Sequence, residues 1–116
     1  MKKNKEKIAV PKRVYISGRI SGRNINEAKE EFSKAKTLLI LIGFDAINPL
    51  DLPHKENSTW EDYMIIDIKE LFTCDYIVML HEWWMSKGAK LEYVIAKELG
   101  IPVFFSVEEL HFSVRE

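Results

Sequence analysis

The chain of 116 residues lacks the features that mark several large classes of protein. It has a single cysteine, Cys74, so no disulfide can form within it, and a reducing compartment such as the cytoplasm is the simplest expectation. No stretch approaches the roughly 18 apolar residues of a membrane span. The apolar stretch 8–10 is also too short for the core of a signal peptide. We therefore expect a cytoplasmic protein with no membrane partner.

An excess of either charge is also missing. The chain has 17 basic and 18 acidic residues, and this near balance is not typical of a surface that binds nucleic acid. His54, His81 and His111 lack the spacing of metal ligands, so we expect neither a metal nor a cofactor. A content of 47% hydrophobic residues is ordinary for a globular protein. We expect a disordered arm over residues 1–11 and one domain over residues 12–116.

Alternating strand and helix patterns run along the chain. Short β-branched or aromatic stretches predict strands at residues 14–17, 44–47, 75–80 and 101–105. Apolar residues at steps of three and four predict the helices between them, with first residues or caps at Asn24, Thr59, Gly88 and Ser106. This order predicts an α/β three-layer sandwich with a parallel sheet of four or five strands in the order 2-1-3-4.

Ligands of such sheets bind beyond the carboxyl ends of the strands, which here lead into loops 17–23, 48–58 and 80–88. The first loop contains two glycines and two arginines before a helix, an arrangement that can bind an anion such as a 5′-phosphate. Its spacing fits neither the dinucleotide-binding fingerprint nor the Walker motif. A glycine turn with two solvated arginines explains the pattern equally well.

Three side chains are candidates for chemistry at this edge. Glu92 follows Ser86-x-Gly88 at the start of a helix, although a surface glutamate of that helix fits the spacing too. Asp67 shares a helix face with Tyr63, and a partly exposed aspartate is the alternative. Tyr15 lies in a buried strand, where its hydroxyl needs either a carboxylate of the site or a backbone carbonyl.

Two adjacent tryptophans, Trp83 and Trp84, follow the third strand. They fit a contact between subunits or loop packing slightly better than a platform for a base. We therefore expect the chain to form a homodimer or a higher homo-oligomer.

Several short motifs together resemble the nucleoside 2-deoxyribosyltransferase superfamily and its relatives, the 2′-deoxynucleoside 5′-monophosphate N-hydrolases. The resemblance covers roughly residues 13–105 and is strongest to a small branch described only as a domain of unknown function. The motifs are Tyr15-Ile16-Ser17-Gly18, Asn48-Pro49, Trp60-x-Asp62-Tyr63-Met64, Cys74-Asp75, Ser86-x-Gly88-Ala89-x-x-Glu92 and Gly100-Ile101-Pro102-Val103.

The resemblance implies a flavodoxin-like fold and cleavage or transfer at the N-glycosidic bond of a deoxynucleoside or its 5′-monophosphate. It gives Glu92 the role of nucleophile, Asp67 that of the acid that assists the leaving base, and Tyr15 that of positioning the nucleophile. It implies oligomers in which a neighbouring subunit completes the pocket. The expected contacts to the small-molecule substrate are Ser17, Gly18, Arg19, Ile20, Gly22, Arg23, Asn48, Pro49, Ser86 and Gly88.

Three hypotheses remain open. The retained residues Tyr15, Asp67 and Glu92 favour an N-glycosidic enzyme, in which Asp67 holds a proton and Glu92 is ionised. The end of the chain soon after the fourth strand favours a nucleotide-binding or sensing module without catalysis. The third hypothesis is an interaction domain that has kept only the scaffold.

Overall fold

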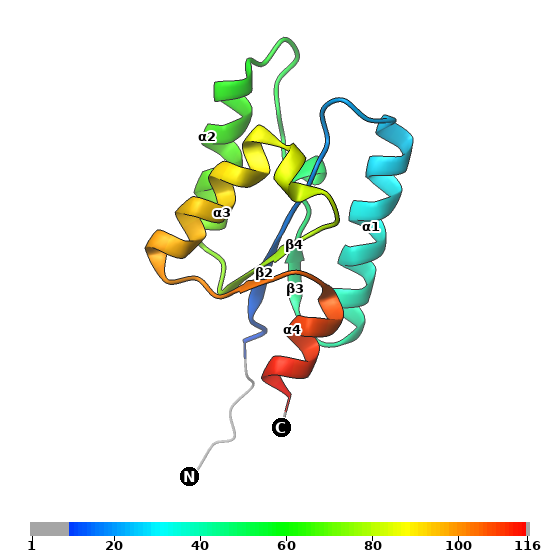
Figure 1. Ribbon diagram of the computed structural model, residues 1–116, viewed down its shortest axis with the longest axis vertical. Coiled ribbons are helices and arrows are strands. Elements are labelled where there is room, and N and C mark those ends of the chain that lie inside the picture. The colour runs from blue at the N-terminus through cyan, green and yellow to red at the C-terminus, as the bar shows by residue number, and fades with distance from the viewer. Residues whose placement is uncertain (1–9, 116) are drawn as a thin grey trace.

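A computed structural model describes residues 10–115 of the chain (Figure 1). Most of the expected arm, residues 1–9, lies outside the described part. The strands are β2 (Arg13–Ser17), β3 (Asp45–Ile47), β4 (Tyr76–Met79) and β5 (Val103–Phe104). The helices are α1 (Ile25–Leu41), α2 (Trp60–Leu71), α3 (Lys87–Leu99) and α4 (Val107–Val114), with the short 3-10 helices η1 (Pro49–Asp51) and η2 (Trp83–Met85).

The four strands form one parallel sheet in the order β3-β2-β4-β5. This is the predicted order 2-1-3-4, so the predicted topology is confirmed. In the register Tyr15 of the central strand β2 lies between Ile47 of β3 and Ile77 of β4. Strand β5 is shorter than its predicted span at both ends: Pro102 has no N–H group to donate to a neighbouring strand, and the N–H of Phe105 donates to the Glu109 side chain.

Helices cover both faces of the sheet, as the alternation predicted. The core against α1 and α4 contains Val14, Ile16, Phe32, Val78 and Leu110. The opposite core, against α2 and α3, contains Tyr15, Leu71, Ile77, Met79 and Ala96. Figure 1 shows α2 and α3 on one side of the strands and α1 and α4 on the other.

Side chains at the predicted caps begin the helices. Asn24 accepts hydrogen bonds from two backbone N–H groups at the start of α1. Thr59 and Asp62 form the reciprocal capping box of α2. Helix α3 begins at Lys87, one residue before the expected Gly88, and its cap is Ser86, whose side chain accepts the N–H of Ala89. None of the helices formed by residues 10–115 has the length and apolarity needed to cross a bilayer.

Gly18, directly after β2, is packed too tightly for a side chain. A Cβ atom there would lie 3.1 Å from both the Cβ of Leu80 and the Cζ of Phe32. We expect Gly18→Ala to lower the free energy of unfolding by about 1–3 kcal/mol through overpacking. Urea denaturation measures this, with the exposed Ser21→Ala as the matched control. A Gly18→Ala variant as stable as the wild type would contradict this packing.

Candidate active site

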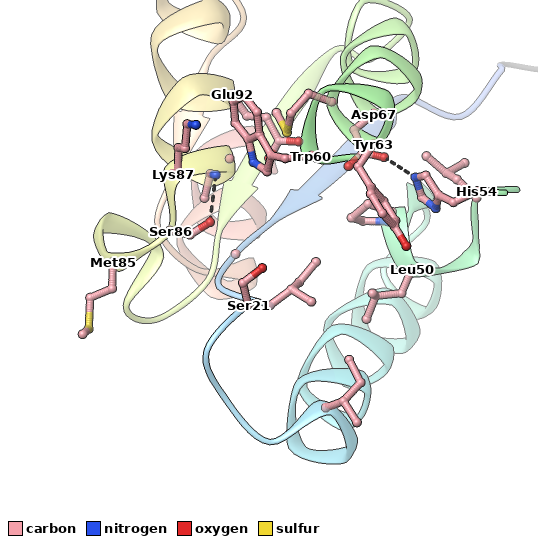
Figure 2. Close-up of a pocket in the computed structure, with 18 residues that line it drawn as sticks. Ser21, Leu50, His54, Trp60, Tyr63, Asp67, Met85, Ser86, Lys87 and Glu92 are labelled. Carbon is pink, nitrogen blue, oxygen red and sulfur yellow. Dashed lines mark hydrogen bonds and ion pairs between the residues drawn. The ribbon is translucent and has the colours of Figure 1, made fainter. Parts of the chain in front are cut away.

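A cavity of about 920 Å³ lies beyond the carboxyl ends of the strands (Figure 2). All three predicted loops contribute to its wall: Gly18 from the first, His54 from the second and Ser86 from the third. Helices α2 and α3 complete it with Asp67 and Glu92. The cavity therefore lies at the edge where the fold was expected to bind a ligand.

Glu92 is the more buried of the two carboxyl groups that line this cavity, with 5% of its surface exposed. The Tyr15 hydroxyl donates to Oε2 of Glu92 at 2.7 Å, and the Ser17 hydroxyl donates to Oε1 at 2.6 Å. Strand β2 supplies both donors because Tyr15 and Ser17 are two residues apart and face the same side of the sheet. Ser17, expected to contact substrate, is fully buried and instead orients Glu92.

Burial raises the pKa of Glu92 to about 7. The hydrogen bonds from Ser17 and Tyr15 oppose this rise, and the nearby negative charge of Asp67 adds to it. Burial is also the main reason why the pKa of Tyr15 is raised well above its usual value, and the charge of Glu92 raises it further. This phenol therefore remains a donor. A carboxyl with a pKa close to neutral can act in either protonation state at physiological pH.

Asp67 projects from α2 into the same cavity and is also buried. Burial raises its pKa, while the hydrogen bond with His54 opposes this rise. Nε2 of His54 lies 2.9 Å from Oδ1 of Asp67. The sequence hypothesis placed the raised pKa on Asp67 alone, but the pKa of both carboxyls is raised, because both are withdrawn from solvent.

Five of the expected substrate contacts line the cavity: Gly18, Ile20, Pro49, Ser86 and Gly88. Asn48 is buried next to the cavity and caps η1, where its side chain accepts the N–H of Leu50. It therefore shapes the second loop and is not part of the wall.

Arg19, Gly22 and Arg23 are not part of the wall. Arg19 pairs with Glu82 at 3.1 Å and donates to the carbonyl of Gly22 at 2.9 Å. Arg23 pairs with Glu31 at 2.6 Å. Both guanidinium groups are thus bound to acidic groups of the chain itself, which the spacing of the loop residues could not reveal.

Lys87 and Trp60, which the sequence hypothesis did not include among the site residues, lie beside Ser86 and Gly88. Lys87 holds its ammonium group 3.9 Å from the centre of the Trp60 ring, a cation–π contact at the cavity wall. Gly88 allows the approach of α2, because a Cβ at this position would lie 3.1 Å from Sδ of Met64. This side of the cavity therefore combines a helix N-terminus, a hydroxyl and a cation.

Trp83 lies outside the cavity wall and packs within the chain. Its ring stacks on Tyr93 at 4.8 Å and lies 6.1 Å from that of Phe105. Trp84 remains 52% exposed. Self-association through this region stays a prediction.

Within residues 10–115 no cluster of three or more His, Cys, Asp or Glu side chains is placed to hold a metal ion.

The raised pKa of Glu92 predicts a pH-dependent stability. At pH values between the usual pKa of 4.5 and the raised pKa of about 7, the folded chain binds more protons at this carboxyl than the unfolded chain does. Stability from this group therefore falls as pH rises through that window, by up to about 3 kcal/mol above pH 7. Asp67 contributes in the same direction.

Glu92→Gln removes the ionisable group and resembles the protonated carboxyl, because its amide has one acceptor oxygen and one donor group for the hydroxyls of Tyr15 and Ser17. We expect this variant to be more stable than the wild type at pH 8 and equally stable near pH 4. Urea unfolding at the two pH values measures the difference. Equal slopes of stability against pH in both proteins would show that Glu92 titrates normally.

Two comparisons place the chain among known proteins. The family model of Domain of unknown function (DUF4406) matches residues 12–105. Among solved structures, the chain is similar to a 2-deoxyribosyltransferase from the psychrotolerant bacterium Bacillus psychrosaccharolyticus, with a TM-score of 0.62 and 21% identity. That similarity covers 78% of this chain and 69% of the other. No curated protein matches the chain.

The similarity to the solved structure establishes a common fold, the nucleoside 2-deoxyribosyltransferase-like arrangement that the sequence motifs indicated. The family model covers most of the chain, including Tyr15, Asp67 and Glu92. The chain therefore belongs to the DUF4406 family and has a nucleoside 2-deoxyribosyltransferase-like fold.

Proposed function

We propose that the chain is an enzyme that cleaves or transfers at the N-glycosidic bond of 2′-deoxynucleosides or their 5′-monophosphates, with Glu92 as the nucleophile. The observation that carries this proposal is the pair of buried carboxyls in one cavity, with Glu92 held by Tyr15 and Ser17. The common fold with a 2-deoxyribosyltransferase supports it.

The two carboxyls have different roles in this reaction. An oxygen of Glu92 forms a bond to C1′ of the sugar while the bond from C1′ to the base nitrogen breaks, and its electron pair stays with the base. Asp67 gives its proton to the departing base. Water or a second base then displaces Glu92 from C1′, which completes hydrolysis or transfer.

Tyr15 and Ser17 stabilise the ionised form of Glu92 and fix its orientation, because both hydroxyls donate to it. A 2-deoxy sugar suits this chemistry, since it lacks the electron-withdrawing hydroxyl that destabilises positive charge at C1′. Nucleophile and acid are thus both supplied by the chain.

The walls of the cavity fit the two ends of such a substrate. Leu50 and Tyr63 offer apolar and aromatic surface to a base on the side of Asp67. Ser86 and Lys87, at the N-terminus of α3, offer donors and positive charge to the sugar or a 5′-phosphate.

Incubation with a panel of deoxynucleosides, their 5′-monophosphates and the matching ribonucleosides tests this function. We expect chromatography to detect free base from at least one deoxy compound, and much slower release from its ribo counterpart. Tight binding without release of base from any compound would instead identify a nucleotide-binding module. Absence of both binding and release would refute the proposal.

A further inference from the structure

The mechanism above does not use His54, which lies in the loop after β3. The exposed fractions of its side chain and of the Asp67 side chain are 12% and 11%, so their contact is largely shielded from water. The backbone N–H of His54 donates to the carbonyl of Leu52 at 3.0 Å, which fixes the chain at this point.

Helix α2 holds the imidazole from two positions. The ring of Tyr63 lies 4.4 Å from the imidazole ring of His54, centre to centre. Asp67, four residues later on the same helix face, lies 2.9 Å from Nε2. Figure 2 shows His54, Tyr63 and Asp67 grouped on one side of the cavity, away from Lys87. The imidazole is therefore fixed relative to the carboxyl it contacts.

Only one oxygen of Asp67 is used by this contact. Oδ1 faces Nε2 of His54, whereas Oδ2 has no hydrogen-bond partner among residues 10–115. Because Asp67 lines the cavity, Oδ2 is the oxygen available to a bound molecule.

We propose that His54 is a positioning residue for Asp67, whose donated N–H directs Oδ2 of Asp67 toward the leaving base and stabilises the carboxylate formed there. This inference rests on the proposed function. In this arrangement the neutral imidazole of His54 carries its proton on Nε2 and donates it in a hydrogen bond to Oδ1 of Asp67. The proton that is transferred to the base is a different one, carried by Oδ2 of Asp67.

The bond from C1′ to the base breaks and its electron pair remains on the base, which takes the proton from Oδ2, while Glu92 bonds to C1′. Asp67 becomes a carboxylate, and the hydrogen bond from His54 becomes charge-assisted and stronger. Asp67 regains its proton when the incoming water or base loses one, and His54 keeps its own proton throughout.

The role of His54 therefore depends on whether the leaving base needs a proton. A purine deoxynucleoside methylated at N7 is cationic, and its base departs neutral without a proton. For a chain that accepts only pyrimidines, 2′-deoxyuridine and its 5-fluoro derivative form the corresponding pair. A purely structural role of His54 would affect both members of a pair alike.

The test measures base release by His54→Ala, His54→Asn and His54→Gln on both members of the pair. We expect His54→Ala to slow the ordinary substrate by about 10- to 100-fold, the effect of one lost hydrogen bond to a charged group. The activated substrate should be slowed by less than about threefold on the same reasoning, because little charge forms on Asp67. His54→Gln, whose amide N–H can reach Oδ1, should keep most of the activity, while the shorter His54→Asn should behave like His54→Ala.

His111→Ala, on the exposed surface of α4, is the matched control and should leave both rates unchanged. Equal slowing of both substrates by His54→Asn and His54→Ala, or no slowing of either, would overturn the positioning role. If the wild type releases no base from any substrate, the proposed function fails and this inference fails with it. Wild-type release with unchanged dependence on the leaving base in the His54 variants would refute this inference alone.

Discussion

Replacing Glu92 by alanine is expected to reduce base release by about 10⁴- to 10⁶-fold, the size of effect seen when a covalent nucleophile is removed. Alanine leaves no group that can bond to C1′, and no other carboxyl in the cavity is held by Tyr15 and Ser17. Substrate binding should persist, because the remaining walls of the cavity are unchanged. Rate measurements together with calorimetric titration separate these two effects.

Two further variants make this experiment specific. Glu92→Gln keeps the shape of the side chain and one acceptor oxygen for the hydroxyls of Tyr15 and Ser17, and it should be as inactive as alanine. Glu98→Ala removes an exposed glutamate from the same helix and should retain full activity. Full activity of Glu92→Ala on a substrate that the wild type cleaves would show that another group attacks the sugar.

Asp67→Asn is expected to slow the release of ordinary bases by about 10²- to 10⁴-fold, the usual contribution of a general acid. Asparagine has the shape of aspartate and can still accept a hydrogen bond from Nε2 of His54, but it has no acidic proton to give. The N7-methylated substrate should be slowed far less, because its base needs no proton.

Kinetics on the pair of substrates measures this difference. Glu61→Gln, at an exposed position of α2, is the control and should change neither rate. If Asp67→Asn slowed the ordinary and the methylated substrate by the same factor, Asp67 would support the cavity without donating a proton.

The part of the site that could be predicted from the sequence is the part fixed by the sheet. The crossover rule places the strand of Tyr15 beside β4, and α3 begins just after β4, so the meeting of Tyr15 and Glu92 follows from topology. A buried tyrosine needs a partner for its hydroxyl, which made the carboxylate of Glu92 a reasonable expectation.

The contacts made by loop residues could not be predicted in this way. His54 reaches Asp67 because the second loop folds back along α2, a path that no periodicity in the sequence encodes. In the first loop, the pairing of Arg19 with Glu82 joins residues 63 positions apart, in two loops whose conformations no pattern determines. Ser17 was expected at the substrate but is fully buried against Glu92, and strand alternation does not say how deeply a hydroxyl is buried.

The same distinction applies to electrostatics. The proximity of two carboxyls was enough to predict that at least one pKa is raised. How the rise is divided depends on the depth of burial and on the donors present, and Glu92 has two hydroxyl donors whereas Asp67 has an imidazole. Neither quantity can be read from spacing along a helix.

The central claim is that Glu92 forms a covalent bond to the sugar. Mass spectrometry of the chain quenched during turnover, in the absence of an acceptor base, tests it most directly. We predict an added 2-deoxyribosyl group, or its 5-phosphate, on the peptide that contains Glu92, and no addition in Glu92→Gln. An adduct on a different residue, or an unmodified chain while base is being released, would contradict the claim.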